Sequence, residues 1–83
     1  MKYELTEHAQ DVLAEREIQT AWLERTLDHP ERVESDRSDP ELEHRLLRIK
    51  EYGNRVLRVI VNKNRSRVRV VTAYFDRGVR KLL

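Results

Sequence analysis

The chain has no cysteine, only two glycines and no long apolar run. The absence of cysteine excludes a disulfide and a thiolate metal site, and two glycines are too few for a glycine-rich phosphate loop. No apolar segment approaches the roughly 20 residues that span a bilayer, and the opening Met-Lys-Tyr-Glu-Leu lacks the apolar core of a signal peptide. We therefore expect a soluble, cytoplasmic protein without a membrane partner.

Histidine and serine do not occur in the patterns that metal binding or nucleophilic catalysis requires. His8, His29 and His44 have no short metal-ligand spacing, and no cysteine accompanies them. The serines at positions 35, 38 and 66 fall in expected loops or strand ends, without the elbow that positions a serine nucleophile. The sequence therefore predicts no metal site and no cofactor.

Charge is plentiful and unevenly distributed along the chain. Residues 1–42 contain five Lys or Arg and twelve Asp or Glu, net −7, whereas residues 43–83 contain twelve and three, net +9, which together give the overall +2. Such segregation creates a strong positive field on one part of a small fold, and this field favours a polyanion such as nucleic acid. Alternatively, the two halves neutralise each other across a surface.

The hydrophobic pattern changes from helical to alternating after Pro30. Apolar residues at helical spacing predict helices over about 6–16 and 19–29, the first with Thr6 as its N-cap. Alternation and turn residues predict strands over about 32–36, 42–52, 55–62 and 67–75, with Gly53 and Asn54 forming a hairpin turn. We predict one α+β domain over residues 1–83, in which two N-terminal helices pack on a three- or four-stranded antiparallel sheet.

The expected sheet carries arginine on one face, because alternation should turn the apolar side chains toward the helices and the arginines outward. Metal-independent RNA cleavage needs a base, an acid and positive donors, and the catalytic candidates are His44, Arg45 and Tyr74. The candidates for RNA binding are basic residues of the strands and the tail: Arg48, Arg58, Arg67, Arg69, Arg77 and Lys81. The alternative is that these arginines only keep a strand face soluble and suppress edge pairing.

Short motifs along most of the chain resemble a known family. They are Thr-Glu-His-Ala at 6–9, Glu-Arg-Glu-Ile at 15–18, Trp22, Leu27, Pro30, Leu-Arg-Val-Ile-Val at 57–61 and Val-Val-Thr-Ala-Tyr at 70–74. This set resembles the small proteins grouped as domain of unknown function 4258, and the resemblance implies that His8 and Arg16 are residues of the family motif. From the residues alone, His8 caps or packs at the helix start and Arg16 pairs with an acid such as Glu15 or Asp36.

That family in turn looks similar to BrnT-type toxins of the RelE superfamily, small ribonucleases that an antitoxin neutralises. BrnT proteins have a Lys-His-Gly-Ile turn followed by a proline, and here residues 15–18 lead to Pro30 at that spacing. Arg45 falls where BrnT has an arginine opening its second strand, and residues 72–74 stand where BrnT has Ser-Ala-Arg. The chain departs from the pattern at two positions, because Arg16 replaces a histidine and Tyr74 replaces an arginine.

Three hypotheses for the function follow from these observations. The first is a toxin-type, metal-independent endoribonuclease that acts on mRNA, free or on the ribosome, and has a RelE/BrnT-like fold and a small antitoxin as its protein partner. The second is a non-catalytic module that binds RNA or DNA with the same face. The third is an interaction protein whose basic sheet receives an acidic partner or a second copy of the chain.

Overall fold

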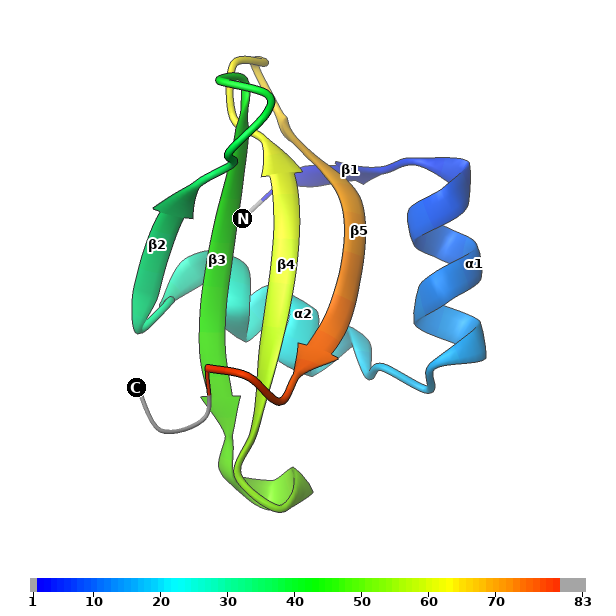
Figure 1. Cartoon of the computed structure of the whole chain (residues 1–83). Coiled ribbons are helices and arrows are strands. Elements are labelled where there is room, and N and C mark those ends of the chain that lie inside the picture. The colour runs from blue at the N-terminus through cyan, green and yellow to red at the C-terminus, as the bar shows by residue number, and fades with distance from the viewer. Residues whose placement is uncertain (1, 80–83) are drawn as a thin grey trace.

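Five strands form one mixed sheet in the computed structural model of the chain, which describes residues 2–79 (Figure 1). The elements in chain order are β1 (Tyr3–Leu5), α1 (Glu7–Glu15), α2 (Thr20–Asp28), β2 (Arg32–Ser35), β3 (Leu42–Ile49), a 3-10 turn (Lys50–Tyr52), β4 (Arg55–Asn62) and β5 (Val68–Asp76). The strand order in the sheet is β1-β5-β4-β3-β2. Strands β2 to β5 pair antiparallel, and β1 pairs parallel to β5.

The α+β class is confirmed, but the prediction of a three- or four-stranded antiparallel sheet is wrong. The difference is β1, which precedes the helices and pairs Tyr3 with Val68 and Leu5 with Val70. Three residues are too few to show an alternating pattern, and the partner strand lies at the other end of the chain. The RelE/BrnT-like arrangement that we expected with the antiparallel sheet is overturned by the same finding.

The strand expected over 42–52 is also shorter than predicted, because β3 ends at Ile49 and a 3-10 turn follows. Gly53 and Asn54 then adopt positive φ angles of 65° and 58°, and the chain reverses into β4. The turn places the Tyr52 ring 5.0 Å from the ring centroids of both Trp22 and Phe75. This aromatic packing explains why the polar-looking end of the pattern leaves the strand.

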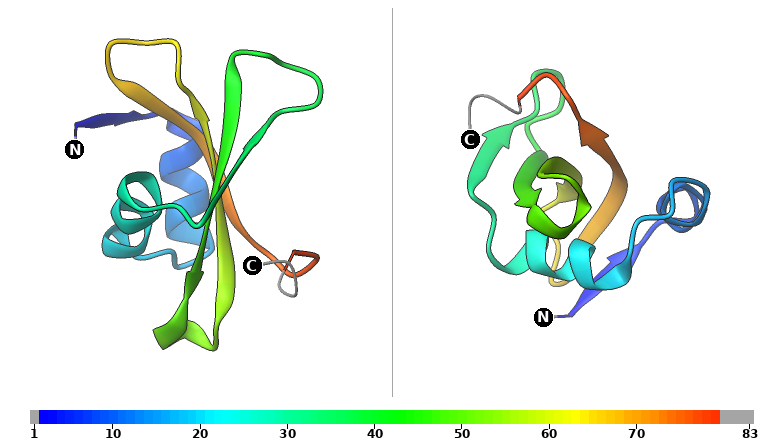
Figure 2. Two further views of the ribbon diagram at one scale, coloured as in Figure 1. Left: turned by 90° about the vertical axis from the view of Figure 1, so that its left-hand side faces the viewer. Right: turned by 90° about the horizontal axis from the view of Figure 1, so that it is seen from below.

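Both helices lie on one face of the sheet (Figure 2, left). Thr6 caps α1 by accepting a hydrogen bond from the Ala9 amide at 3.0 Å, and α2 ends before Pro30, which disfavours helical geometry in the residue before it. The main core forms between the helices and this face of the sheet. Its buried residues are Ala9, Ile18, Trp22, Leu23, Leu27, Leu47, Ile49, Leu57, Val59, Val61, Val70 and Ala73.

The opposite face of the sheet, which we call the open face, is the one that the helices do not cover (Figure 2, left). Registers pair Leu46 with Arg58 and Arg58 with Tyr74, so these side chains share a face. Leu46 and Val56 are fully buried there, and Arg58 is 8% exposed. The open face therefore combines a buried apolar floor with polar and charged residues. Among the described residues, no helix is long and apolar enough to cross a membrane.

Candidate functional site

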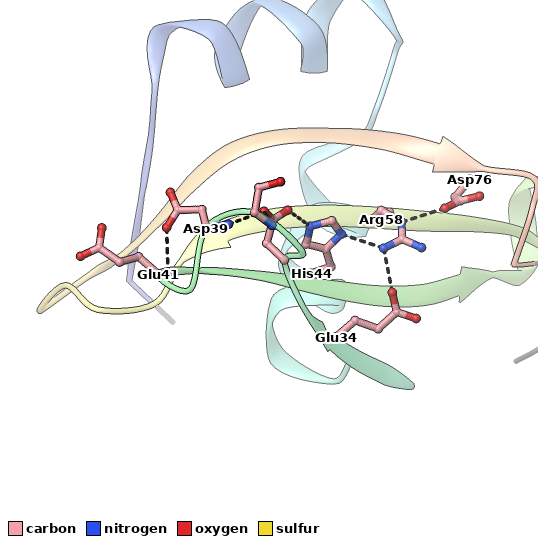
Figure 3. Close-up of polar contacts among 8 residues, drawn as sticks. Glu34, Asp39, Glu41, His44, Arg58 and Asp76 are labelled. Atoms are coloured by element: carbon pink, nitrogen blue, oxygen red, sulfur yellow. Dashed lines mark hydrogen bonds and ion pairs between the residues drawn. The ribbon is translucent and has the colours of Figure 1, made fainter.

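A histidine, an arginine and three carboxylates form one hydrogen-bonded network on the open face (Figure 3). His44 lies on β3 and Arg58 on the neighbouring strand β4. The His44 Nε2 atom is 2.7 Å from Asp36 Oδ1, and its Nδ1 atom is 2.7 Å from an Arg58 guanidinium nitrogen. The imidazole thus bridges a carboxylate and a guanidinium.

These contacts define the proton arrangement on His44. A guanidinium only donates hydrogen bonds, so Nδ1 accepts from Arg58 and carries no proton, and Nε2 donates its proton to Asp36. Asp36 itself is fixed by the turn after β2, where its other oxygen accepts from the amides of Ser38 and Asp39 at 3.1 and 2.9 Å. The hydrogen bond from His44, followed by those from the two amides, lowers the pKa of Asp36. Asp36 is therefore a fixed, ionised orienting group for the imidazole.

Two further carboxylates hold Arg58 in place. Its Nε atom donates to Asp76 Oδ2 at 2.7 Å, and a terminal nitrogen donates to Glu34 Oε1 at 3.1 Å. Burial lowers the pKa of Arg58, but the hydrogen bonds to Glu34 and Asp76 outweigh burial and raise it overall. The same contact with Arg58 lowers the pKa of Glu34. Arg58 is therefore a permanent cation that is compensated on two sides.

The network forms the floor of an open hollow of about 280 Å³. The lining residues come from β2, the loop after it, β3 and β4: Glu34, Ser35, Asp36, Arg37, Ser38, His44 and Arg58. Arg37 forms no ion pair within residues 2–79 and is exposed. The hollow thus offers an uncompensated cation at its rim beside an imidazole with a defined tautomer.

Arg45 lies on the other face from His44, so the expectation that it faces outward with the remaining arginines is wrong. It pairs with Val59 in the register that points to the helices, and its guanidinium donates to the Leu27 carbonyl at 3.1 Å and to Glu43 at 2.9 Å. Arginines in adjacent strands share a face only if the register matches, and the sequence does not reveal the register. Arg45 secures the end of α2 and is separated from the network by the sheet.

The other sequence-predicted residues divide between the two ends of the open face. Tyr74 lies directly across from Arg58, and Arg48 is paired with Val56 in the same register. Arg69 binds Glu4 at 3.2 Å, across the parallel pair of strands. Arg67 lies in the β4–β5 loop and Arg77 follows β5; both are exposed. Lys81 falls outside the described residues.

The motif residues of α1 act on the edge of β5. Strand β1 pairs only with Val68–Val70, and beyond it the Arg16 guanidinium donates to the Ala73 carbonyl at 2.6 Å. His8 Nε2 lies 3.4 Å from Thr72 Oγ1 on the same strand. An uncovered strand edge is prone to pairing with another chain, so the role of Arg16 here is to cap this edge. Arg16 contacts a backbone carbonyl in place of the acid that the residues alone suggested.

Replacing Thr6 by alanine is expected to lower the free energy of unfolding by about 1–2 kcal/mol. The Thr6 hydroxyl has two roles, because it accepts from the Ala9 amide and donates to the Val71 carbonyl at 3.2 Å. The matched control is Thr20→Ala, since Thr20 is exposed in the first turn of α2 and makes no cap hydrogen bond. Urea unfolding of both variants measures the difference. Equal losses would contradict the assigned role of Thr6.

Several of the ion pairs join the acidic first half of the chain to the basic second half. Glu34 binds Arg58, Glu4 binds Arg69 and Glu51 binds Arg25. The hydrogen bonds from Arg25 lower the pKa of Glu51 to about 2. At these positions the two halves neutralise each other, as the second interpretation of the charge pattern proposed. The positive field of the open face is accordingly concentrated on the arginines that lack a carboxylate.

A family model described as a domain of unknown function (DUF4258) matches residues 5–75. The chain belongs to this family. The matched segment includes His44 and Arg58 and ends just before Asp76. No curated protein and no solved structure matches the chain. The membership confirms that part of the sequence resemblance, whereas the likeness to BrnT and RelE toxins is not shown by any of the comparisons.

Sequence reasoning did not select Glu34, Asp36, Asp76 or Arg55 as site residues. Asp36 carried the clearest indication, because an aspartate two residues before Ser38 and four before Pro40 is typical of a side chain that caps a turn. Glu34 and Asp76 are 24 and 18 residues from Arg58 and meet it only through the strand registers. Among residues 2–79, no cluster of three His, Cys, Asp or Glu side chains could hold a metal ion.

Proposed function

We propose that the chain is a metal-independent endoribonuclease of the toxin type, acting on RNA in the cytoplasm through the open face of its sheet. The observation that carries the proposal is the His44 imidazole, held 2.7 Å from Asp36 on one side and 2.7 Å from Arg58 on the other, in the floor of an open hollow. A base with an orienting carboxylate next to a cation is the arrangement required for proton transfer at a phosphate.

The reaction needs Arg58 to change its partner. In the free protein Arg58 occupies the Nδ1 lone pair of His44. A phosphate entering between Arg37 and Arg58 draws the Arg58 guanidinium toward its own oxygens, because charge-assisted hydrogen bonds to an anion are stronger than those to a neutral imidazole. Nδ1 then becomes free to accept a proton. Substrate binding and activation of the base are thus the same event.

His44 Nδ1 removes the proton of the ribose 2′-hydroxyl, and the resulting oxygen attacks the adjacent phosphorus. Arg58 and Arg37 stabilise the charge that builds on the phosphate, and Asp36 stabilises the imidazolium through Nε2. The bond to the 5′-oxygen breaks as this oxygen takes a proton from Tyr74, whose position opposite Arg58 places its phenol on the same face. The products are a 2′,3′-cyclic phosphate and a 5′-hydroxyl, and solvent restores both side chains.

A non-catalytic RNA-binding module is the second candidate, and the ion pairs favour it. Arg58 is compensated by Glu34 and Asp76, and both nitrogens of His44 are occupied in the free protein. In that case the network only shapes the hollow, and the open face binds RNA without cleaving it. A ribosome or a small antitoxin as partner remains a prediction for either candidate.

We expect His44→Ala to reduce cleavage of a fluorescent RNA oligonucleotide by about 10²- to 10⁴-fold, the usual contribution of a general base. Asp36→Asn and Tyr74→Phe should also reduce cleavage, whereas His29→Ala is the matched control because His29 is exposed at the end of α2. The assay contains EDTA, and mass spectrometry identifies the cyclic phosphate. Growth of bacteria expressing the intact chain tests the toxin role.

Intact RNA after incubation with folded wild-type protein would exclude the nuclease, and equal rates for His44→Ala and His29→Ala would exclude this assignment of the base. Binding without cleavage would favour the second candidate.

A further inference from the structure

A second hollow, of about 350 Å³, lies at the end of the sheet where β4 begins and β5 ends. Its lining residues are Arg55, Val56, Phe75, Asp76 and Arg77. Val56 pairs with Asp76 in the register that shares the open face with Arg58. The segment Arg77–Val79 leaves β5 on the side of the sheet opposite to the helices (Figure 2, left). The second hollow and the His44 hollow therefore open on the same face.

The second hollow contains two cations without a carboxylate partner. The Arg55 guanidinium lies 4.7 Å from the centroid of the Tyr52 ring, a cation–π distance. Within residues 2–79, neither Arg55 nor Arg77 forms an ion pair. The carboxylate of Asp76 is already committed, because one oxygen accepts from Arg58 at 2.7 Å and the other from the Gly78 amide at 2.8 Å.

The same hollow offers apolar and aromatic surface beside these cations. Val56 is fully buried, and Phe75 is half-buried against the Tyr52 ring at 5.0 Å between ring centroids. Cations next to aromatic rings are the combination that binds single-stranded nucleic acid, because cations contact the phosphate and rings stack on a base. A small anion alone would make no use of the apolar part of the hollow.

The two hollows share a wall. Arg58 lines the His44 hollow, Asp76 lines the second hollow, and the ion pair between them at 2.7 Å separates the two spaces. Arg58 and Val56 are also two residues apart on the same strand, about 7 Å at the usual rise per residue. A chain of nucleotides that places one phosphate beside His44 therefore passes directly into the second hollow.

We propose that the second hollow is a subsite for the nucleotide next to the reacting phosphate in single-stranded RNA. Arg55 and Arg77 bind its phosphate, and Val56 and Phe75 receive its base. This inference rests on the proposed function for the identity of the ligand, but binding tests it independently of cleavage.

The test uses the full chain and a fluorescein-labelled hexamer of 2′-O-methyl adenosine, which has no free 2′-hydroxyl and cannot be cleaved. Fluorescence anisotropy gives Kd at several salt concentrations for wild type, Arg55→Gln, Arg77→Gln and the double variant. Lys2→Gln is the charge-matched control, since Lys2 is exposed beside β1 on the far side of the sheet. Each of the two arginine variants should raise Kd several-fold and reduce the slope of log Kd against log salt by about 0.7, the value for one phosphate contact in a single strand.

Replacing one adenosine by an abasic residue should weaken binding to wild type, because the base then no longer stacks. Wild-type Kd and salt slope in the double variant would overturn the subsite, as would the absence of any binding to wild type. Weakened binding in the double variant, together with no RNA cleavage, would leave the subsite standing and remove the nuclease. His44-dependent cleavage with unchanged binding in the double variant would do the reverse.

Discussion

Leu57→Ala is expected to lower the free energy of unfolding by about 3–5 kcal/mol, the upper part of the range for a buried leucine. Leu57 lies on the central strand β4, is fully buried and belongs to the core between the sheet and the helices. The substitution removes apolar area from the core and leaves a cavity that the sheet cannot close, because the strands on both sides are hydrogen-bonded to β4. For 83 residues the total stability is on the order of 4–12 kcal/mol, so this loss is a large share of it.

Chemical unfolding monitored by the fluorescence of Trp22 measures the effect, since the Trp22 ring belongs to the same core. Val33→Ala is the control, because Val33 is 53% exposed on the edge strand β2 and should change the free energy by less than about 0.5 kcal/mol. If Leu57→Ala does not fold, the smaller truncation Leu57→Val should show the same effect to a lesser degree. A Leu57 variant as stable as Val33→Ala would mean that the core is not where we place it.

The helices illustrate what local sequence determines. Ala9 and Val12 recur at helical spacing behind the cap Thr6, and the sequence predicts a helix over about 6–16 where the structure has Glu7–Glu15. Each of these features depends on neighbours within one turn. The pattern of α2 ends at Pro30 for an equally local reason. Local physical rules were sufficient for these elements.

The sheet shows where local rules end. Strand β1 is only three residues long, and Tyr3 meets its partner Val68 across nearly the whole chain. Arg45 and Arg58 both stand next to leucines in alternating strands, yet they point to opposite faces because Arg45 pairs with Val59 and Arg58 with Leu46. A shift of one residue in register would exchange them. The membership of the candidate site is therefore a property of the pairing and cannot be read from either strand alone.

Charge pairing had the same dependence on register. The sequence established that the second half of the chain is basic, and from this we expected a broad positive face. In the structure Arg58 and Arg69 are compensated by carboxylates from the first half, whereas Arg37, Arg55 and Arg77 are not. The uncompensated arginines line or border the two hollows of the open face. Neutralisation thus narrows a diffuse field to two places where a phosphate gains most from binding.

The His44 network also depends on Arg58 for stability, and Arg58→Met should lower the free energy of unfolding by about 3 kcal/mol near neutral pH. This is the lower end of the range for breaking a buried ion pair, because the side chains of Glu34 and Asp76 are 29% and 19% exposed and retain some water. Methionine keeps most of the volume, so the loss reports on charge. Arg32→Met is the matched control: Arg32 binds the same carboxylate, Glu34, at 2.7 Å but is 41% exposed, and an exposed pair contributes at most about 1 kcal/mol.

The loss in Arg58→Met should depend on pH in a defined direction. Arg58 lowers the pKa of Glu34 below its usual value of 4.5, so the wild type gains stability from this contact above pH 4.5 and loses it as pH falls through the lowered pKa. Without Arg58 the contribution is absent at every pH. The stability difference between wild type and Arg58→Met should therefore be largest at neutral pH and shrink toward pH 3. A difference that stays constant over this range, or one no larger than that of Arg32→Met, would show that Arg58 does not act through its carboxylates, and the orientation of His44 would then need another source.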